Sequence, residues 1–396
     1  MVDATAQFSS ARMAGISGAG ARDATAGRSA TMSLAEYCAL ADGVAVAPAQ
    51  SGAWVSAWAN AAGMDTAIVI AGPEGGPQVA LPLEIVRKGP FRVARFMSGS
   101  HANGNFPPFR PGSGILKPAD IVAAVRAARP DVDVVHLERL CETMGEAVTP
   151  FASFSRSESP NIALAVCLDG GFEALLDRAS GKRKRKKHRS QSRKFEAAGG
   201  FRRLEAQTPE DVAEILSLFY VMKAERFRKL GVPDVFAPPG VQAFFGRLFA
   251  DALSLSPKPF VLHSLEVGGK VRAITGSSIA GDRLICEFGA IIEDELAVAS
   301  PGEFLSFANI REACADGYDI YDFSVGDEPY KRLWCNIETR HFDLTIPVSA
   351  KGRLLAAALG AESRVKRAIK GNKMIWALAK RLRKKTIAAP ATTDEE

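Results

Sequence analysis

Two short segments of this chain combine residue types that could bind a phosphate and hold a reacting group beside it. Ser300-Pro301-Gly302 stands where a helix should begin, and the polar turn 326–331 follows an apolar strand predicted for 318–325. A helix N-terminus presents unpaired backbone N–H groups and the positive end of the helix dipole, which suit a phosphate. Tyr330 and Lys331 lie in the turn. Together the segments predict a site for a phosphate-bearing donor, with chemistry nearby.

The elements that must position this site follow a definite order in the second half. Helices come first, then three antiparallel strands joined by Gly-containing turns, then helix, strand, short helix and strand. The predicted helices cover 172–198, 209–229 and 240–253, and the predicted strands cover 260–267, 271–280, 284–292, 318–325 and 340–348.

The first half shows the same kind of order, but less clearly. Its predicted helices are 52–61 and 119–128, and its predicted strands are 66–71, 78–87, 91–97 and 132–140. A Gly- and Pro-rich loop, 98–109, lies between them and carries His101, Asn103 and Asn105. The fold class is therefore α/β (α+β), with two units, each a mixed and mostly antiparallel sheet flanked by helices. We place a disordered tail at 1–32, the units at 33–160 and 161–350, and a basic tail at 351–396.

The composition indicates a soluble protein of the cytoplasm. A length of 396 residues allows two domains with cores of their own. No apolar run is long enough to span a bilayer, and the first 30 residues lack a secretory signal. The six cysteines are scattered without a CxxC pair, which favours reduced thiols over a disulfide frame or a zinc site. The histidines have no metal-ligand spacing, so we expect no metal.

Most of the net charge of +6 comes from two basic blocks, Lys182–Arg189 and Arg364–Lys385. The first falls inside a predicted helix and lacks interleaved aromatic residues, which disfavours nucleic acid. It is either a solvated helix or a surface for an anionic partner or CoA phosphate. The second predicts a basic amphipathic helix with Trp376 on its apolar face. Such a helix either lies on an anionic membrane or packs on the protein.

The segment GYDIYDFSVGDEPYKRLW resembles the CelD-type acyltransferases, a branch of the GNAT N-acetyltransferases that is related to the Fem peptidyltransferases. The motif appears here as Asp322-Phe323, Gly326-Asp327, Lys331 and Trp334. The resemblance extends over most of 33–348. It implies two tandem GNAT-like domains that face one cleft, with acetyl-CoA or another acyl-CoA as the donor in the second.

One departure from the GNAT pattern concerns the donor. Where these enzymes have a loop with two glycines for the pyrophosphate, this chain has Ala297 to Gly302 with one glycine, followed by Glu303. A carboxylate there would repel a pyrophosphate. Either the backbone N–H groups from Gly302 to Leu305 suffice, or the donor is not CoA.

The resemblance also implies roles for individual residues. The donor site would comprise Phe288, Gly289 and Ala290 on a splayed strand, and Ser300, Gly302, Glu303 and Phe304 at the helix start. Glu287 would act as general base, directly or through water, with Asp327 as an alternative. Tyr330 would protonate the leaving thiolate.

The acceptor would be a sugar or an amine, bound by Lys331 and by His101 and Asn105 of the polar loop. The main hypothesis is thus an acyl-CoA-dependent N- or O-acyltransferase, most simply an acetyltransferase, that serves polysaccharide or cell-envelope synthesis. It would be cytoplasmic, with a peripheral position at the inner membrane face left open. The alternatives are Fem-like aminoacyl transfer from aminoacyl-tRNA and a non-catalytic, membrane-associated scaffold.

Overall fold

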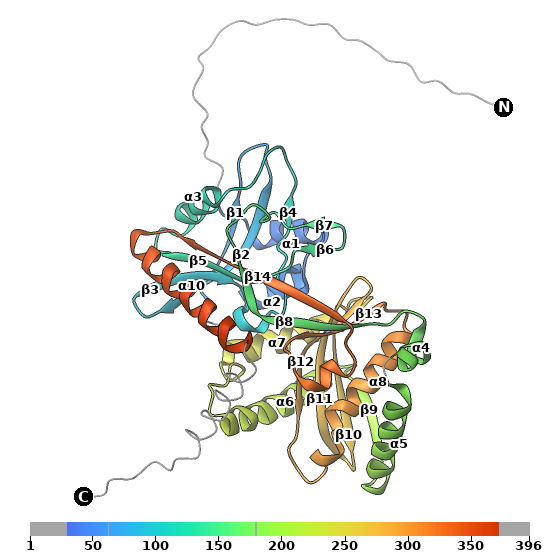
Figure 1. Cartoon of the computed structure of the whole chain (residues 1–396). Coiled ribbons are helices and arrows are strands. Elements are labelled where there is room, and N and C mark those ends of the chain that lie inside the picture. The colour runs from blue at the N-terminus through green and yellow to red at the C-terminus, as the bar shows by residue number, and fades with distance from the viewer. Residues whose placement is uncertain (1–29, 62, 179, 372–396) are drawn as a thin grey trace, which may run out of the picture.

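The computed structural model describes residues 30–61, 63–178 and 180–371, and one sheet of 12 strands runs through both halves of the chain (Figure 1). Its order is β1-β2-β3-β5-β14-β8-β13-β12-β11-β10-β9, and the short β4 pairs with β2. The strands of the first half are β1 (Thr66–Ala71), β2 (Gln78–Lys88), β3 (Phe91–Phe96), β4 (Phe109–Arg110) and β5 (Val134–Leu140). Those of the second half are β8 (Ser157–Cys167), β9 (Phe201–Glu205), β10 (Phe260–Val267), β11 (Lys270–Ala280), β12 (Arg283–Ile291), β13 (Ile320–Val325) and β14 (Ile337–Pro347). A separate small hairpin joins β6 (Thr143–Met144) to β7 (Ala147–Val148).

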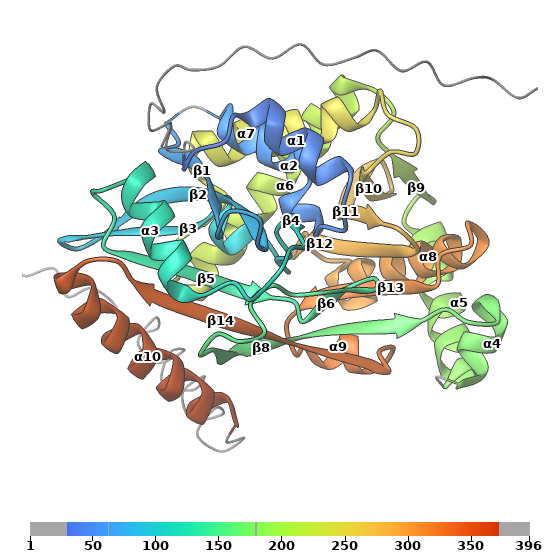
Figure 2. The same cartoon turned by 90° about the horizontal axis from the view of Figure 1, so that it is seen from above.

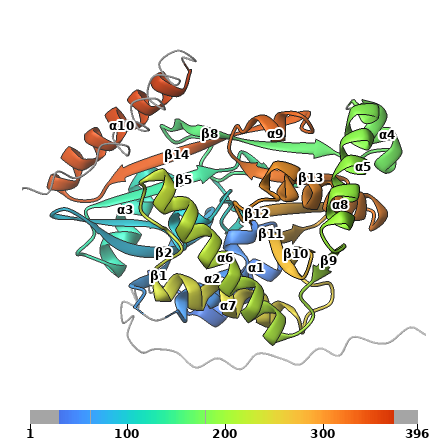
Figure 3. The same cartoon turned by 90° about the horizontal axis from the view of Figure 1, so that it is seen from below.

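The helices cover both faces of this sheet. They are α1 (Leu34–Asp42), α2 (Gly52–Ala59), α3 (Pro118–Ala128), α4 (Gly171–Arg178), α5 (Gly181–Ala197), α6 (Pro209–Leu230), α7 (Pro239–Ala252), α8 (Pro301–Ala315), α9 (Pro329–Arg332) and α10 (Ala350–Gly371). Helices α1, α2, α6 and α7 gather on one side, and α5, α8 and α10 lie on the other (Figures 2 and 3). The mixed α/β architecture expected from the sequence is confirmed.

The last strand of the described residues joins the two halves. β14 pairs antiparallel with β5 of the first half along one edge and with β8 along the other. The prediction of a strand at 340–348 was therefore close, but β8 itself was not predicted. Because β8 and β14 lie side by side in the middle of the sheet, the two halves share backbone hydrogen bonds and not only side-chain contacts.

Each half contains one parallel pair of strands that separates soon after it begins. β12 and β13 pair only from Arg283↔Ile320 to Ile285↔Asp322. β3 and β5 pair only at Val93↔Val134 and Ala94↔Val135. Beyond these residues the two strands of each pair no longer share backbone hydrogen bonds, and we call this place the opening of the pair.

An aromatic cluster holds the halves together on the α6–α7 side. The helix predicted around Trp54 and Trp58 is α2, and both indole rings contact Phe244 of α7, with centroids 5.1 and 4.9 Å apart. Both tryptophans are buried, and their indole N–H groups donate to Ser98 and Glu84. This packing fixes the loop after β3 against the second half.

One predicted helix differs from the structure. The helix expected over 172–198 is broken into α4 and α5 at Ser180, whose φ of +59° lies in the left-handed region and cannot continue a helix. The basic tail predicted from 351 begins with α10, which buries Leu355 and Leu359 against Val93 and Val134. The predicted apolar face with Trp376 lies outside the described residues.

Over the described part of the chain, no helix has the length and apolar character that crossing a membrane would require.

Candidate active site

Glu287 is the extra residue of a β-bulge in β12. Along the β11–β12 ladder, Gly276 pairs with Phe288 and Ser277 pairs with Cys286, so Glu287 has no partner on β11. Gly276 is required here, because a Cβ atom would lie 2.2 Å from the Phe288 ring. A bulge re-aims the side chain it carries and is common beside active sites.

The Glu287 carboxylate is held by one residue from each half. The Asn103 side-chain amide donates to one carboxylate oxygen at 2.7 Å and to the Glu287 carbonyl at 2.8 Å, and the Ser278 hydroxyl donates to the other carboxylate oxygen at 2.6 Å. Burial raises the pKa of Glu287 to about 7, although the hydrogen bonds from Ser278 and Asn103 oppose that rise. A group that titrates near neutral pH can accept a proton and release it again.

Hydrogen bonds hold β12 and β13 together where their opening begins. Ser324 on β13 donates through its hydroxyl to the Cys286 carbonyl at 2.7 Å. Arg283 donates to Asp322 at 2.7 Å, and the other oxygen of Asp322 accepts from the Ser324 N–H. Ser324 has a φ of +55°, where a serine is strained, and these bonds hold it there. The separation of the strands is thus built into the fold.

Beyond these hydrogen bonds, the edge of β12 that faces away from β11 has no neighbouring strand among the described residues. Phe288 turns its ring away from that edge into the core, 4.4 Å from the Phe219 ring and 5.1 Å from the Phe245 ring. Gly289 is exposed and Ala290 is partly exposed. The three donor-site residues predicted on this strand therefore differ. The Phe288 side chain belongs to the core, whereas the backbone at Gly289 and Ala290 can be reached from solvent.

The start of α8 offers fewer free amides than the sequence suggests. The N–H groups of Glu303 and Phe304 both donate to the Ser300 carbonyl, at 3.1 and 3.2 Å. The Phe304 side chain is buried, and Gly302 packs closely against Ile291 at the end of β12. Of the amides expected to grip a pyrophosphate, the Gly302 N–H is the one for which the described residues supply no acceptor.

The first basic block lies beside this helix start. Lys187 on α5 pairs with the Glu303 carboxylate, which offsets the negative charge that argued against a phosphate. Gln191 donates to the Ala299 carbonyl at 2.8 Å, and the His188 ring stacks on Phe304. Helix α5 is therefore packed against α8, and its outward face brings further cations near the same end of the sheet.

The three site residues predicted in the turn after β13, Asp327, Tyr330 and Lys331, differ in exposure and in the contacts they make. Tyr330 is 43% exposed, and burial raises the pKa of its phenol. Its ring lies 6.0 Å from Phe323. Asp327 is exposed and pairs with Arg332 at 2.6 Å. Lys331 is only 5% exposed, and its ammonium donates to the Ser324 and Val325 carbonyls and pairs with Glu328. Lys331 therefore holds the turn, contrary to the expectation of a free substrate contact.

The polar loop of the first half does reach the second, but through a different residue than expected. His101 packs among the rings of Trp58, Phe236 and Phe245, and burial lowers its pKa to about 4. Asn105 is 2% exposed, with its amide bonded to Gln50 and to the Glu138 carbonyl. These two side chains hold the loop in place, which leaves Asn103 as the residue that meets Glu287.

Asn103 and Ser278 are thus the two residues at Glu287 that the sequence did not connect with it. Both are small polar residues whose types carry no chemical signature, and only the strand pairing places them at Glu287. Within the described ranges, no group of three His, Cys, Asp or Glu side chains could hold a metal ion.

Comparison with known proteins finds similarity of two kinds, a family model that matches part of the second half and a solved structure of the same fold. Residues 182–332 match the family model described as acetyltransferase (GNAT) domain. The solved structure of FemX is 12% identical, with a TM-score of 0.52, and the match covers 82% of this chain and 98% of that one. None of the curated proteins compared matches the chain.

Two further solved structures are less similar. The C-terminal domain of a putative lysylphosphatidylglycerol synthetase from Agrobacterium fabrum is 12% identical, with a TM-score of 0.47, over 83% of this chain and 95% of that one. A tandem GNAT protein from the clavulanic acid biosynthesis pathway is 12% identical, with a TM-score of 0.41, over 79% and 93%. The family model matched by residues 182–332 and the fold shared with FemX agree with the strand order described above, so this part of the chain has a GNAT-type fold.

Proposed function

We propose that this protein transfers an acyl group from acyl-CoA to an amine or hydroxyl acceptor bound between its two halves, with Glu287 as general base. One observation carries the proposal. Glu287 stands on a bulge beside the opening of β12 and β13, has a pKa of about 7, and is bonded to Asn103 of the other half. A base at the border between the halves suits an acceptor that both halves contact.

The proposed reaction uses three groups in sequence. Glu287 takes a proton from the acceptor, whose nitrogen or oxygen attacks the thioester carbonyl. The Gly289 N–H, on the edge of β12 that faces away from β11, donates to that carbonyl as its oxygen gains charge. The C–S bond then breaks, and the thiolate takes its proton from Tyr330, whose raised pKa keeps the phenol protonated until that step. The protonated Glu287 then returns its proton to solvent, and the Tyr330 phenolate takes a proton back from solvent.

Three features support acyl-CoA as the donor. The matched family is an acetyltransferase domain. The Gly302 N–H lies at the end of β12, where the helix dipole favours an anion. Cations of α5 stand beside it, and Lys187 already partners Glu303. The acceptor class, sugar or amine, and a role in polysaccharide or envelope synthesis rest on the resemblance of the motif at 322–334.

A second candidate is aminoacyl transfer from tRNA. It is favoured by the capping of the Glu303 and Phe304 amides by Ser300, which leaves little of a pyrophosphate cradle. Lys182, Lys186, Arg189 and Arg193 of α5 are exposed and recur at helical spacing along one face, as a phosphate backbone would require.

Calorimetry with acetyl-CoA, longer acyl-CoAs and free CoA tests the proposal. We expect an acyl-CoA to bind and to raise the melting temperature by mass action. The Glu303→Gln variant should bind CoA at least as well as the unaltered protein, with Glu266→Gln as the matched control. Absence of binding by every CoA species at millimolar concentration would remove the proposal.

The same experiment separates the alternatives. Salt-sensitive binding of aminoacyl-tRNA, with no response to CoA species, would favour the second candidate. Binding to anionic liposomes with no response to either donor would instead indicate a non-catalytic scaffold.

A further inference from the structure

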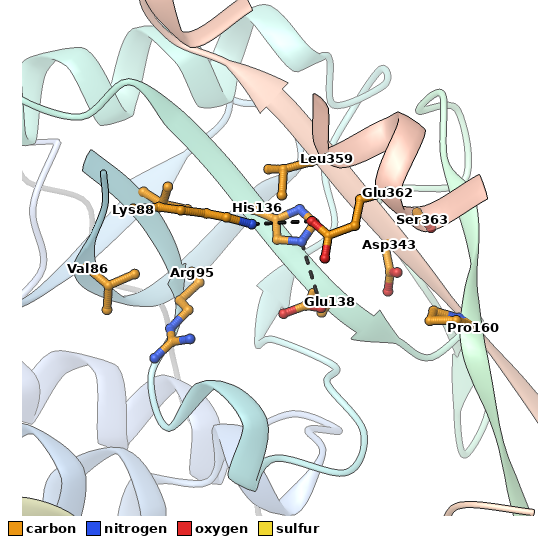
Figure 4. A pocket seen from close by; sticks show the side chains of 11 residues that line it. Val86, Lys88, Arg95, His136, Glu138, Pro160, Asp343, Leu359, Glu362 and Ser363 are labelled. Carbon is orange, nitrogen blue, oxygen red and sulfur yellow. Dashed lines mark hydrogen bonds and ion pairs between the residues drawn. The ribbon is translucent and has the colours of Figure 1, made fainter. Parts of the chain in front are cut away.

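The pocket of about 180 Å³ at the β3–β5 opening is lined by charged side chains that are already paired within the protein (Figure 4). Lys88 pairs with Glu362 at 3.4 Å, and the Arg95 guanidinium is held by Glu84 at 2.7 Å. These charges therefore need no ligand. An unmatched polar group lies instead on β14, close to the loop that reaches Glu287.

His341 of β14 is a buried side chain whose ring nitrogens have no partners. The residue is only 5% exposed. Its Nδ1 atom is out of contact with solvent and has no hydrogen-bond partner, and its Nε2 atom also makes no hydrogen bond with a described residue. A neutral imidazole carries one donor and one acceptor, and burying such groups unsatisfied costs free energy. A ligand that bonds to the ring would offset part of that cost.

The Nε2 side of the ring faces the polar loop of the first half. A Cβ atom placed on Gly104 would lie 3.5 Å from Nε2 of His341 and 3.3 Å from the Cys141 sulfur. Gly104 and Cys141 are both partly exposed, so solvent comes close to Nε2. Gly104 directly follows Asn103, which donates to Glu287. The same short stretch of loop thus meets both the proposed base and the unpartnered ring.

The sheet is irregular where it carries His341. On β8, three residues lie between Glu158 and Ile162, whereas on β14 His341 alone lies between their partners Phe342 and Arg340. The pairing of β14 with β5 also shifts in register just after Phe342. Irregularities of this kind re-aim side chains and are common beside active sites.

The charges that act on the His341 ring are engaged by other groups. Burial and the Arg139 charge lower the pKa of His341 to about 4, against the opposing effect of Asp322, so the ring is neutral near pH 7. Asp322 pairs with Arg283 at 2.7 Å, and Arg139 donates to two backbone carbonyls of the loop. Burial, and to a smaller extent Asp322, also raises the pKa of Glu287, so the Asp322 carboxylate lies near both groups.

We infer that the acceptor is a neutral polyhydroxylated molecule, a sugar in its chemistry, with one hydroxyl at Glu287 and another at Nε2 of His341. A hydroxyl can donate to an imidazole nitrogen or accept from its N–H, so it fits either tautomer of the ring. An ammonium group only donates and a carboxylate only accepts, and each would bring a charge to a place whose charges are already paired. The inference rests on the proposed function, because it names the acceptor of that same site.

Nuclear magnetic resonance of the full chain with nitrogen-labelled histidine rings tests the inference. The chain has five histidines, and the signals lost in His341→Phe belong to His341. The probes are D-glucose, D-galactose, D-mannose and N-acetyl-D-glucosamine, each added without a donor, with propylamine and sodium acetate as charged comparisons. At least one sugar should shift the His341 signals more than those of any other histidine. No shift with any sugar at tens of millimolar, or an equal shift with propylamine, would overturn the inference.

Two variants locate the contact. His341→Phe keeps an aromatic ring and removes both nitrogens, so sugar binding should weaken about tenfold or more, while the melting temperature stays the same or rises. Gly104→Ala places a methyl group beside Nε2 and should also weaken sugar binding. Its control is Gly360→Ala, whose new Cβ atom has no neighbour within 4 Å.

The outcomes separate this inference from the proposed function. Sugar binding by His341→Phe and Gly104→Ala that equals binding by the unaltered protein would place the sugar elsewhere and refute the assignment. Because the sugars are added without a donor, a failure of every acyl-CoA to bind leaves this test intact. A failure of every sugar likewise leaves the donor and the base to their own tests.

Discussion

The side-chain amide of Asn103 donates to the Glu287 carboxylate at 2.7 Å, although 184 residues separate them in sequence. The first residue belongs to a loop of the first half and the second to a bulged strand of the second half. The proposed catalytic base therefore lies at the contact between the two halves. This single contact makes each half necessary for the environment of Glu287.

Replacement of Glu287 by Gln should abolish most turnover, because the amide cannot accept a proton. General-base catalysis contributes about 10²- to 10⁴-fold, so we expect a loss of that size in kcat. In the unaltered protein kcat/KM should rise with pH and level off above about 7, since the ionised form is the active one. Steady-state kinetics from pH 5.5 to 8.5 measure both effects, with Glu266→Gln as control. Unchanged kcat in the variant would exclude Glu287 as the base.

The same substitution should stabilise the fold at alkaline pH. A carboxyl group whose folded pKa is raised from 4.5 to about 7 contributes its full stability below 4.5, and this contribution is lost as pH rises through 7. The melting temperature of Glu287→Gln relative to the unaltered protein should therefore increase between pH 5 and pH 8. Scanning calorimetry across that range measures it, and a difference that stays constant with pH would contradict the raised pKa.

Removal of the Asn103 amide should make the base harder to ionise. Its hydrogen bond favours the charged carboxylate, so Asn103→Ala should move the apparent pKa of kcat/KM upward. The exposed Asn60→Ala serves as a control for the loss of an asparagine. A profile that does not move would mean that the contact leaves the base unaffected.

Loss of the Tyr330 hydroxyl should slow turnover and leave the fold intact. The side chain is 43% exposed and its hydroxyl has no hydrogen-bond partner among the described residues, so Tyr330→Phe removes a proton donor and little packing. We expect kcat to fall about tenfold or more and the melting temperature to stay nearly constant. Turnover equal to that of the unaltered protein would remove Tyr330 from the mechanism.

Lys331 and its neighbour Arg332 should differ sharply in their effects on stability. Lys331→Met leaves two carbonyls and Glu328 without their buried cation, which should cost about 2–4 kcal/mol of unfolding free energy. Arg332→Gln breaks only exposed ion pairs with Asp327 and Glu338 and should cost at most about 1 kcal/mol. Urea unfolding compares the two variants, and equal losses would refute the structural role of Lys331.

Local signals were sufficient to predict most elements of the second half. The alternation of apolar residues and the Gly-containing turns predicted β10, β11 and β12 within one or two residues. The break at Ser180 lies at a Ser-Gly pair, which is a turn signal, and it was missed because the helical residues on both sides were interpreted as one continuous helix. β8 was missed because Pro160 and Asn161 interrupt its pattern.

The site was harder to predict than the fold, since its residues meet only through the sheet. Glu287 could be singled out as a carboxylate within a strand, but its bond to Asn103 depends on contacts across the halves. His101 is part of a polar sequence, yet rings from three other segments surround it, and no local pattern shows that. Asn105 and Lys331 are residue types that often bind substrates, but here their polar groups make hydrogen bonds that hold the fold.

The position of β14 has a consequence for biosynthesis. β5 is made early, but the strand that completes its hydrogen bonds ends at Pro347, near the end of the described chain. While the ribosome adds the intervening 200 or so residues, one edge of β5 stays without its partner strand. Unpaired strand edges can form hydrogen bonds with other chains. The protein is therefore most vulnerable to aggregation during its own translation, and closure of the sheet by its last strand ends that exposure.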